Sequence, residues 1–218
     1  LPIEQTEHGT FIMSSKDMCM IEHIPELLEA GIKSFKIEGR MKSAYYTAVV
    51  TNAYRMAMDA YAADPEGYAY RPEWMRELES VSHREYCTGF YFDSPADNAQ
   101  TVTRGGYVRE KAHLAVALGA EAPEGVEAVN ENGRVYKFAQ RNKLISGERG
   151  ELLTPGRVGI PFEIGEIYAE DGTPLTVLSM DKTEVTIRVK GTNRDLKSFT
   201  TGDYRAVIDV SGVKKSGE

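Results

Sequence analysis

The sequence predicts an α/β segment followed by an all-β segment, and two observations support this division. Up to about residue 95, runs with the period of a strand alternate with runs with the period of a helix. After about residue 100, short runs rich in β-branched and aromatic residues are separated by turn signals. We therefore expect α/β elements over residues 1–95, a small antiparallel barrel or sandwich over 100–212, and a frayed tail over 213–218.

The α/β elements follow one another at regular intervals. The apolar run at residues 10–15 indicates the end of a strand. A helix is predicted from about Pro25, because proline is tolerated in a first turn, to the typical C-cap glycine Gly31. A second strand is predicted over 34–38 and a long helix over 43–63, a stretch that contains neither Gly nor Pro. This order is typical of a parallel sheet or barrel. Two such units cannot close a barrel, and the chain does not begin with Met, so we expect it to be the later part of a longer α/β domain.

The remaining elements are predicted from turn signals and apolar periodicity. A short helix is expected over 72–80. In the all-β segment, Asn132-Gly133 and Asp171-Gly172 each lie between two strand-like runs, which is a strong hairpin signal. Further strands are predicted in the runs AHLAVAL, EVTIRVK and YRAVID, so that about six to eight short strands fill this segment.

The stretch SFKIEGRMKS at residues 34–43 carries the candidate catalytic residues. Two apolar residues alternate there with three charged ones, Lys36, Glu38 and Arg40, so that one face of the predicted strand is fully charged. A glycine then allows a tight turn, and Ser43 can cap the next helix, whose N-terminus favours anions. This pattern indicates a working site at the end of a strand. The alternative is an edge strand with a solvated charged face.

A cluster of cations is the candidate nucleic-acid-binding feature. The formal net charge is −7, so the chain as a whole is a poor generic binder of nucleic acid. One segment nevertheless concentrates basic residues that can contact phosphates: Arg134, Lys137, Arg141, Lys143 and Arg149. Asn142, between two of them, can add a hydrogen bond to a phosphate or sugar. The alternatives are a solvated loop face or ion pairs with Glu127, Glu131 or Glu151.

The two cysteines, Cys19 and Cys87, do not form a disulfide framework in a chain of this size, which favours a reducing, cytoplasmic compartment. Neither belongs to a CxxC pair, so a self-contained zinc site is not expected. The residues alone favour Cys19 as a small buried hydrophobe. No run of about 18 apolar residues occurs, so neither a membrane-spanning helix nor a membrane partner is expected. HExxH, GxSxG, Walker and GxGxxG patterns are also missing from the sequence.

Two stretches carry a resemblance to a known family. The collagenase-like peptidases, family thirty-two of the unassigned (U) peptidases, end their catalytic barrel with a segment similar to SSKDMCMIEHIPELLEAGIKSFKIEGRMKSAYYTAVVTNAYRMAMDAY. Their C-terminal barrel is similar to the later stretch RNKLISGERGELLTP. The resemblance implies that residues 1–95 hold the last βα units of a TIM-like barrel and that a β-barrel follows. It also implies that the N-terminal barrel portion of the same protein is a partner of this chain.

Several members of this family look like RNA-modifying enzymes, and one branch hydroxylates the wobble uridine of tRNA and uses prephenate. In that branch four cysteines hold an iron–sulfur cluster, and the resemblance places the fourth ligand on Cys19. The other three lie upstream, so a cluster is expected in the intact protein and none in this chain alone. Cys87 departs from the family pattern and receives no ligand role. The resemblance thus implies tRNA as a partner, an iron–sulfur cluster as cofactor and prephenate as a co-substrate.

Three functions remain open from the sequence. In the first, the chain is the C-terminal part of an RNA-hydroxylating protein and is not active alone. Lys36 and Arg40 then bind an acidic small molecule or RNA phosphate, and Glu38 orients them or moves a proton. In the second, the protein is a peptidase, although no nucleophile–base pair or metal signature in this chain supports that activity. In the third, the β-rich segment makes the protein a non-catalytic binding module.

Overall fold

The computed structural model of the chain describes residues 3–7, 9–12, 15–92, 94, 100–101, 106–175, 177–178 and 184–190. By their contacts the residues divide into two compact units, Leu1–Glu110 and Lys111–Glu218, and each unit is described by itself. Within the described ranges, no helix is both long enough and apolar enough to span a bilayer.

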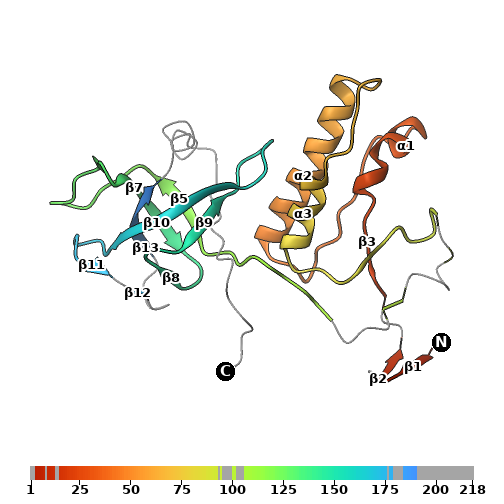
Figure 1. The fold of residues 1–218 in the computed structure, drawn as a ribbon, viewed down its shortest axis with the longest axis horizontal. Coiled ribbons are helices and arrows are strands. Elements are labelled where there is room, and N and C mark those ends of the chain that lie inside the picture. Colours follow the sequence, from red (N-terminus) through yellow and green to blue (C-terminus); the bar gives the residue numbers. More distant parts are fainter. Residues whose placement is uncertain are drawn as a thin grey trace. The chain divides into compact units, whose positions relative to one another are not determined.

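The first unit is built on two helices that pack against each other, α2 (Ala44–Ala63) and α3 (Pro72–Ser80). A one-turn helix, η1 (Ile21–His23), runs directly into the short helix α1 (Ile24–Glu29). The strands described in this unit are short and form two pairs (Figure 1): β1 (Ile3–Thr6) with β2 (Gly9–Ile12), antiparallel, and β3 (Asp17–Met18) with β4 (Tyr86–Cys87), parallel.

The helix predictions are confirmed. The helix expected over 43–63 is α2, and the helices expected after residue 24 and over 72–80 are α1 and α3. Ser43 caps α2, because its Oγ accepts a hydrogen bond from the N–H of Tyr46 at 3.2 Å. Residues spaced four apart on α2, including Tyr45, Val49 and Ala53, are buried. The absence of helix breakers from this stretch and its apolar stripe therefore predicted the longest helix correctly.

The strand predicted over 34–38 is wrong. This stretch has neither strand nor helix conformation, and none of the described strands pairs with it. The predicted alternation is present, because Phe35 and Ile37 are half-buried while Lys36 and Glu38 are exposed. Periodicity indicates which side chains share a face, but a strand also needs a hydrogen-bonded neighbour. The described part of this chain supplies no such neighbour.

The predicted strand at 10–15 is corrected as well. Its first residues belong to β2, which ends at Ile12 and forms an antiparallel hairpin with β1, while residues 13 and 14 lie outside the described ranges. The parallel pairing that the structure does show joins β3 to β4, with Asp17 opposite Tyr86. The predicted strand–helix–strand–helix order is therefore not formed in the described part of the first unit.

The second unit is all-β, as predicted, and its main sheet is antiparallel (Figure 1). The hydrogen-bonded order β11-β10-β13-β7-β5 forms the path of the sheet, while β6 pairs with β7 and β9 with β10. A separate small pair joins β8 to β12. The bounds of these strands are β5 (Ala115–Gly119), β6 (Val129–Asn130), β7 (Gly133–Gln140), β8 (Leu144–Ile145), β9 (Arg149–Leu152), β10 (Ile160–Tyr168), β11 (Pro174–Leu175), β12 (Val177–Leu178) and β13 (Glu184–Lys190).

The described strands form a curled half-barrel rather than a closed barrel. The runs AHLAVAL and EVTIRVK form β5, which begins at Ala115, and β13. No pairing between described residues joins the two ends of the sheet. The run YRAVID, which was predicted as a further strand, lies outside the described residues. The prediction of an antiparallel β segment is therefore confirmed, whereas closure is not seen in the part of the chain that the structure describes.

The hairpin between β6 and β7 lies one residue earlier than predicted. Asn130 pairs with Gly133, so Glu131 and Asn132 form the two-residue turn. Gly133 has a φ of +128°, and a Cβ placed on it would lie 2.2 Å from the carbonyl oxygen of Val189. The glycine is therefore required at the first position of β7 by its backbone conformation and by the close approach of β13.

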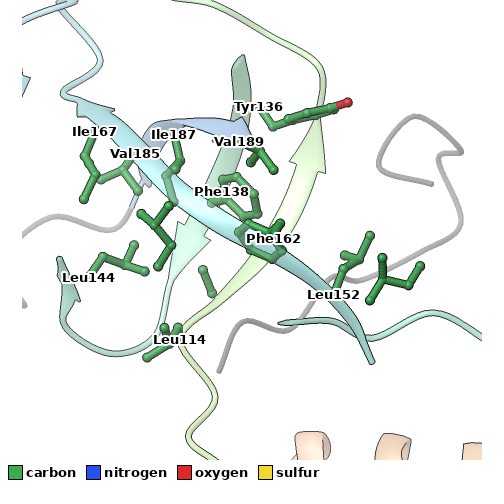
Figure 2. Packing of buried hydrophobic residues seen from close by; sticks show 13 residues of the cluster. Leu114, Tyr136, Phe138, Leu144, Leu152, Phe162, Ile167, Val185, Ile187 and Val189 are labelled. Atoms are coloured by element: carbon green, nitrogen blue, oxygen red, sulfur yellow. The ribbon is translucent and has the colours of Figure 1, made fainter. Parts of the chain in front are cut away.

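Apolar side chains of the three longest strands meet in one core, which Figure 2 shows from close by. Phe138 of β7, Ile164 of β10 and Ile187 of β13 each have 0% of their surface exposed. Leu114 and Leu144 close the core from segments that flank β5 and β7. Burial of several large apolar side chains in one cluster gives this unit its own hydrophobic core.

A buried guanidinium ties β10 and β13 to the β6–β7 hairpin. Arg188 is 2% exposed, and its Nε donates to Oε2 of Glu166 at 2.9 Å. Its Nη2 donates to the carbonyl oxygen of Glu127 at 3.0 Å. The Tyr168 hydroxyl also donates to Oε2 of Glu166, at 2.5 Å, and these two hydrogen bonds hold the pKa of Glu166 below its usual range. The network satisfies a charge that is otherwise costly to bury.

Replacing Arg188 with Ala should lower the free energy of unfolding of the second unit by roughly 3 kcal/mol. The change leaves the Glu127 carbonyl without the Arg188 donor and Glu166 with only the Tyr168 hydroxyl, and it opens a space beside β10. Urea unfolding followed by circular dichroism measures the loss, and hydrogen exchange in β10 and β13 locates it. Arg149→Ala, which removes an exposed arginine from β9, is the matched control and should change stability by no more than about 0.5 kcal/mol. Equal stability of the two variants would show that the network contributes little.

Candidate functional site

The first unit contains a cavity of about 580 Å³. Its walls are β3, the unpaired stretch at 34–38, the inward face of α2 and the side chains of β4 and the loop after it. The lining is mixed: methionines, aliphatic residues and aromatic residues form most of it, together with a few charged side chains. A concave site with a mainly apolar lining and a few polar groups is typical of a ligand-binding pocket.

Two of the three predicted catalytic residues, Lys36 and Glu38, line this cavity together. Nζ of Lys36 lies 3.7 Å from Oε2 of Glu38, and both side chains are largely exposed. Oε1 of Glu38 accepts a hydrogen bond from the backbone N–H of Arg40 at 2.9 Å. Arg40 itself is exposed and its side chain is not part of the lining. The structure therefore unites one cation and one carboxylate at the cavity and leaves the second predicted cation beside it.

Lys42 is a lining residue that the sequence did not single out. Its Nζ donates to the carbonyl oxygen of Ser82 at 2.6 Å and lies 3.8 Å from the centre of the Tyr107 ring. A second ring, that of Tyr46, lies 5.2 Å from the same nitrogen. Cation–π contacts of this kind hold an ammonium group in a defined position. Ser82 and Tyr107 are distant from Lys42 in the sequence, so the local pattern could not have indicated these two contacts.

Cys19 also lines the cavity and is 7% exposed. Its Sγ is 3.7 Å from the hydroxyl oxygen of Tyr54. That oxygen already accepts a hydrogen bond from the N–H of Met20 at 2.8 Å, so its own hydrogen is free to point toward the sulfur. Burial raises the pKa of the Cys19 thiol, and burial likewise raises the pKa of Tyr54. Cys19 is thus a neutral thiol with a hydrogen-bond donor beside it.

The chain by itself offers no complete metal site in its described residues. Within the described ranges, no group of three or more His, Cys, Asp or Glu side chains is arranged to hold a metal ion. Cys87 is half-buried on β4, and its carbonyl oxygen accepts a hydrogen bond from the N–H of Cys19 at 2.8 Å. Cys19 can therefore supply one soft ligand, and a metal centre needs further ligands from elsewhere.

The predicted basic patch in the second unit does not form one surface. Arg134 and Lys137 lie an odd number of residues apart on the regular strand β7, so their side chains point to opposite faces of the sheet. Lys137 forms an ion pair with Glu184 of β13 at 2.8 Å. Arg141 and Lys143, which follow β7, are both exposed.

Asn142, between these two cations, uses its Oδ1 to accept a hydrogen bond from the N–H of Lys143 at 2.8 Å. The backbone N–H groups of Arg141 and Asn142 both donate to the carbonyl oxygen of Leu114, at 2.7 and 3.0 Å. The segment at 141–143 is thus fixed to the sheet by its backbone while its two charged side chains face solvent. It is the part of the predicted patch that can contact phosphates.

A helical unit that encloses a cavity, followed by an antiparallel β unit, defines a two-unit protein of the α and β class. The chain belongs to peptidase family U32. The model of the family, described as "Peptidase family U32", matches residues 3–101, and the model of "Peptidase family U32 C-terminal domain" matches residues 125–199. The two matches together cover most of the chain, and they confirm the family that the sequence motifs indicated.

Curated relatives within this family carry two kinds of name. "tRNA hydroxylation protein P1" of Bacillus subtilis is 36% identical over 169 residues, which are 78% of this chain and 38% of that protein. "tRNA hydroxylation protein P" of Escherichia coli is 33% identical over 172 residues, 78% of this chain and 35% of that protein. A "Collagenase" of Porphyromonas gingivalis is 32% identical over 89 residues, 41% of this chain and 25% of that protein. The chain therefore spans little more than a third of the length of the two tRNA hydroxylation proteins and a quarter of the length of the collagenase.

Proposed function

We propose that the intact protein hydroxylates the wobble uridine of tRNA, and that this chain supplies part of the active site and an RNA-docking unit. The observation that carries the proposal is the cavity in which a thiol, an ammonium and a carboxylate, those of Cys19, Lys36 and Glu38, face one space. The names of the relatives that match 78% of the chain support the reaction class. The chain alone is not expected to be active, and a cytoplasmic location fits a tRNA substrate.

The proposal includes an architecture. Residues 1–95 are the end of a TIM-like barrel, and the unpaired stretch at 34–38 becomes one of its strands when the preceding part of the protein lies beside it. The alternation of half-buried and exposed side chains in this stretch supports that proposal, because it is the pattern of a strand. A stretch with unpaired backbone N–H and C=O groups is a ready template for a neighbouring strand. In a barrel, the charged residues that end such a strand lie at the catalytic face.

We assign a role to each of the three charged residues, Lys36, Glu38 and Arg40, from its position at the cavity. The ammonium of Lys36, which is 87% exposed, binds a carboxylate of an acidic co-substrate such as prephenate. Glu38 orients that ammonium and holds or moves a proton at the reacting group. Arg40, beside the cavity, contacts a phosphate of the RNA. These roles match the sequence-based hypothesis, with Arg40 moved from the centre of the site to its edge.

Cys19 fits the role of one ligand to an iron–sulfur cluster. Its sulfur lines the cavity, and the Tyr54 hydroxyl stands within 3.7 Å to donate a hydrogen bond to a thiolate. The cluster, when bound, supplies electron-transfer chemistry. The other cysteine ligands belong to the preceding part of the intact protein. Cys87 is given no ligand role.

A peptidase activity is the second candidate, because the family and one relative carry such names. The state of Cys19 argues against it as a nucleophile, since burial raises the pKa of its thiol whereas nucleophilic cysteines have lowered values. The purified intact protein, prepared without oxygen, separates the two functions. Incubation with tRNA and prephenate should add an oxygen atom to the wobble uridine, detected by mass spectrometry of the nucleosides. Cleavage of a collagen-like peptide with unmodified tRNA would instead support the peptidase.

The second unit is proposed to dock tRNA through the exposed side chains of Arg141 and Lys143. Their backbone is fixed by the two hydrogen bonds to the Leu114 carbonyl, so the cations are presented from a rigid segment. The Oδ1 of Asn142 accepts the hydrogen bond from the Lys143 N–H, and its NH₂ group can still donate to a phosphate or sugar. Arg134 and Lys137 are left as weaker candidates, because they face opposite sides of β7.

Reversing both charges, in the double variant Arg141→Glu with Lys143→Glu, should weaken tRNA binding by the intact protein. Loss of two phosphate contacts should also reduce the magnitude of the slope of log affinity against log salt by about 2. Filter-binding titrations over a range of salt concentrations measure both effects. The double variant Arg157→Glu with Lys190→Glu makes the same charge change at exposed positions of the same unit. Equal affinities for the two double variants would exclude residues 141 and 143 as the docking surface.

A further inference from the structure

The loop that follows β4 presents three aromatic rings in succession to solvent. Phe90 is 76% exposed, and Tyr91 and Phe92 are each 54% exposed. Large aromatic side chains normally stabilise a folded protein because they are buried away from water. Three adjacent exposed rings are therefore unusual on a protein surface. We call residues 88–92 the aromatic loop.

The backbone of the aromatic loop is held in a defined turn. The N–H of Tyr91 donates to the carbonyl oxygen of Thr88 at 3.3 Å. Gly89 has a φ of +65°, and a Cβ placed on it would lie 2.9 Å from Sδ of Met18. The loop therefore packs closely against Met18 of β3, and the positive φ of residue 89 favours glycine there.

One of the three rings is also fixed by a neighbour. The ring of Phe92 lies 4.1 Å, centre to centre, from the ring of His23, with 30° between the two planes. This contact holds the C-terminal end of the aromatic loop against η1, while the rings of Phe90 and Tyr91 stay accessible to solvent. The loop is thus held at Gly89 and at Phe92, on either side of Phe90 and Tyr91, so its backbone loses little conformational entropy when a flat ligand stacks on the exposed rings.

The aromatic loop belongs to the wall of the cavity described above. Tyr91 is one of the lining residues, and Lys36 and Lys42 line the same space. With Lys16, the charged lining contains three lysines against two carboxylates, those of Asp17 and Glu38, in a chain whose net charge is −7. Exposed rings beside cations suit single-stranded nucleic acid, because bases stack on the rings while phosphates meet the cations.

We propose that the aromatic loop is a base-stacking site for the unpaired nucleotides of the RNA substrate at the entrance of the cavity. Tyr91 stacks on the base that enters the cavity, and Phe90 stacks on a flanking base. The proposal rests on the proposed function and adds the residues that hold the unpaired bases. Stacking on aromatic rings tolerates any base, so the loop contributes affinity and position rather than sequence preference.

The test uses the intact protein and a tRNA anticodon stem–loop that carries the fluorescent base 2-aminopurine in its loop. Stacking quenches the fluorescence of this base, so binding of the wild-type protein should quench it. Tyr91→Ala and Phe90→Ala should each weaken binding roughly 5- to 100-fold and reduce the quenching. Because no phosphate contact is lost, the dependence of affinity on salt should stay as in the wild type. Tyr91→Trp should preserve both binding and quenching.

Two variants control for trivial causes. Leu118→Ala removes an exposed apolar side chain, 50% exposed, from the second unit and should leave binding and quenching unchanged. Tyr91→Leu keeps an apolar side chain of similar size but removes the ring, so it should bind as weakly as Tyr91→Ala even if alanine there disturbs folding. Binding by Tyr91→Leu and Phe90→Ala as tight as the wild type would overturn the proposal.

Other outcomes also decide the matter. If the Phe90 and Tyr91 variants unfold at a lower temperature but bind RNA normally, the rings pack against the rest of the protein, and the stacking site does not exist. If the wild type hydroxylates tRNA while these variants bind normally, the stacking proposal fails and the proposed function stands. A folded wild-type protein that neither binds the stem–loop nor hydroxylates tRNA would contradict both.

Discussion

Replacing Glu38 with Gln should lower the rate of tRNA hydroxylation by the intact protein at least 100-fold. A positioned general acid or base typically contributes a rate acceleration of about this size. The substitution removes the charge that faces Lys36 and the group that we propose holds a proton at the reacting centre. It keeps an oxygen that can accept the hydrogen bond from the Arg40 N–H, so the turn after residue 38 should persist. Initial rates, measured by mass spectrometry of tRNA nucleosides at saturating tRNA and prephenate, give the size of the effect.

A matched variant shows whether the effect belongs to the site. Asp59→Asn removes the charge of another exposed carboxylate, which forms an ion pair with Arg55 on α2 and does not line the cavity. It should hydroxylate tRNA at the wild-type rate. Both substitutions should change the free energy of unfolding by no more than about 0.5 kcal/mol, as is usual at exposed positions. Wild-type turnover by Glu38→Gln would remove Glu38 from the mechanism.

The second large effect is expected at Cys19. The intact protein, prepared without oxygen, should be brown and absorb in the near-visible range, and Cys19→Ser should lose most of the colour and of the bound iron. A serine hydroxyl is nearly the same size as the thiol and can keep the contact with Tyr54, but it is a poor ligand for iron in a cluster of thiolates. Iron content per chain and the absorbance spectrum measure the loss.

Cys87→Ser provides the control for the cysteine experiment. Cys87 lies on β4 next to β3, yet it receives no ligand role, so this variant should keep the iron and the colour of the wild type. Equal loss from both serine variants would point to a general destabilisation of this part of the protein. A wild-type intact protein that binds no iron under these conditions would remove the cluster from the account and favour the peptidase alternative.

The sequence predicted the elements whose stability is local. α2 has a cap at Ser43, no helix breaker and a buried stripe, so its limits could be read within one residue. β13 is a run of β-formers between polar residues and was also predicted correctly. The hairpin before β7 was placed one residue late, because the glycine, with its positive φ and its close approach to Val189 of β13, is the first residue of β7 and not part of the two-residue turn.

Features that depend on distant partners could not be predicted in the same way. The stretch at 34–38 has the period of a strand but no partner strand in the described part of this chain. Arg134 and Lys137 are only three residues apart in the sequence, but their side chains lie on opposite faces of the sheet. The hydroxyl of Tyr54 contacts Cys19 although the two residues are 35 positions apart in the sequence. Residue spacing does not predict a contact of this kind. The resemblance to a family pointed to Cys19, whereas the structure was needed to find Tyr54.

The modification state of tRNA in cells tests the central claim most directly. The host is a strain of Escherichia coli that lacks its own tRNA hydroxylation protein and in which mass spectrometry finds the wobble uridine unmodified. Expression of the intact protein should restore an added oxygen atom at that position, seen by mass spectrometry of the isolated nucleosides, whereas expression of Glu38→Gln should not. Unmodified uridine in cells that contain soluble, folded wild-type protein would contradict the assignment of tRNA hydroxylation to this cavity.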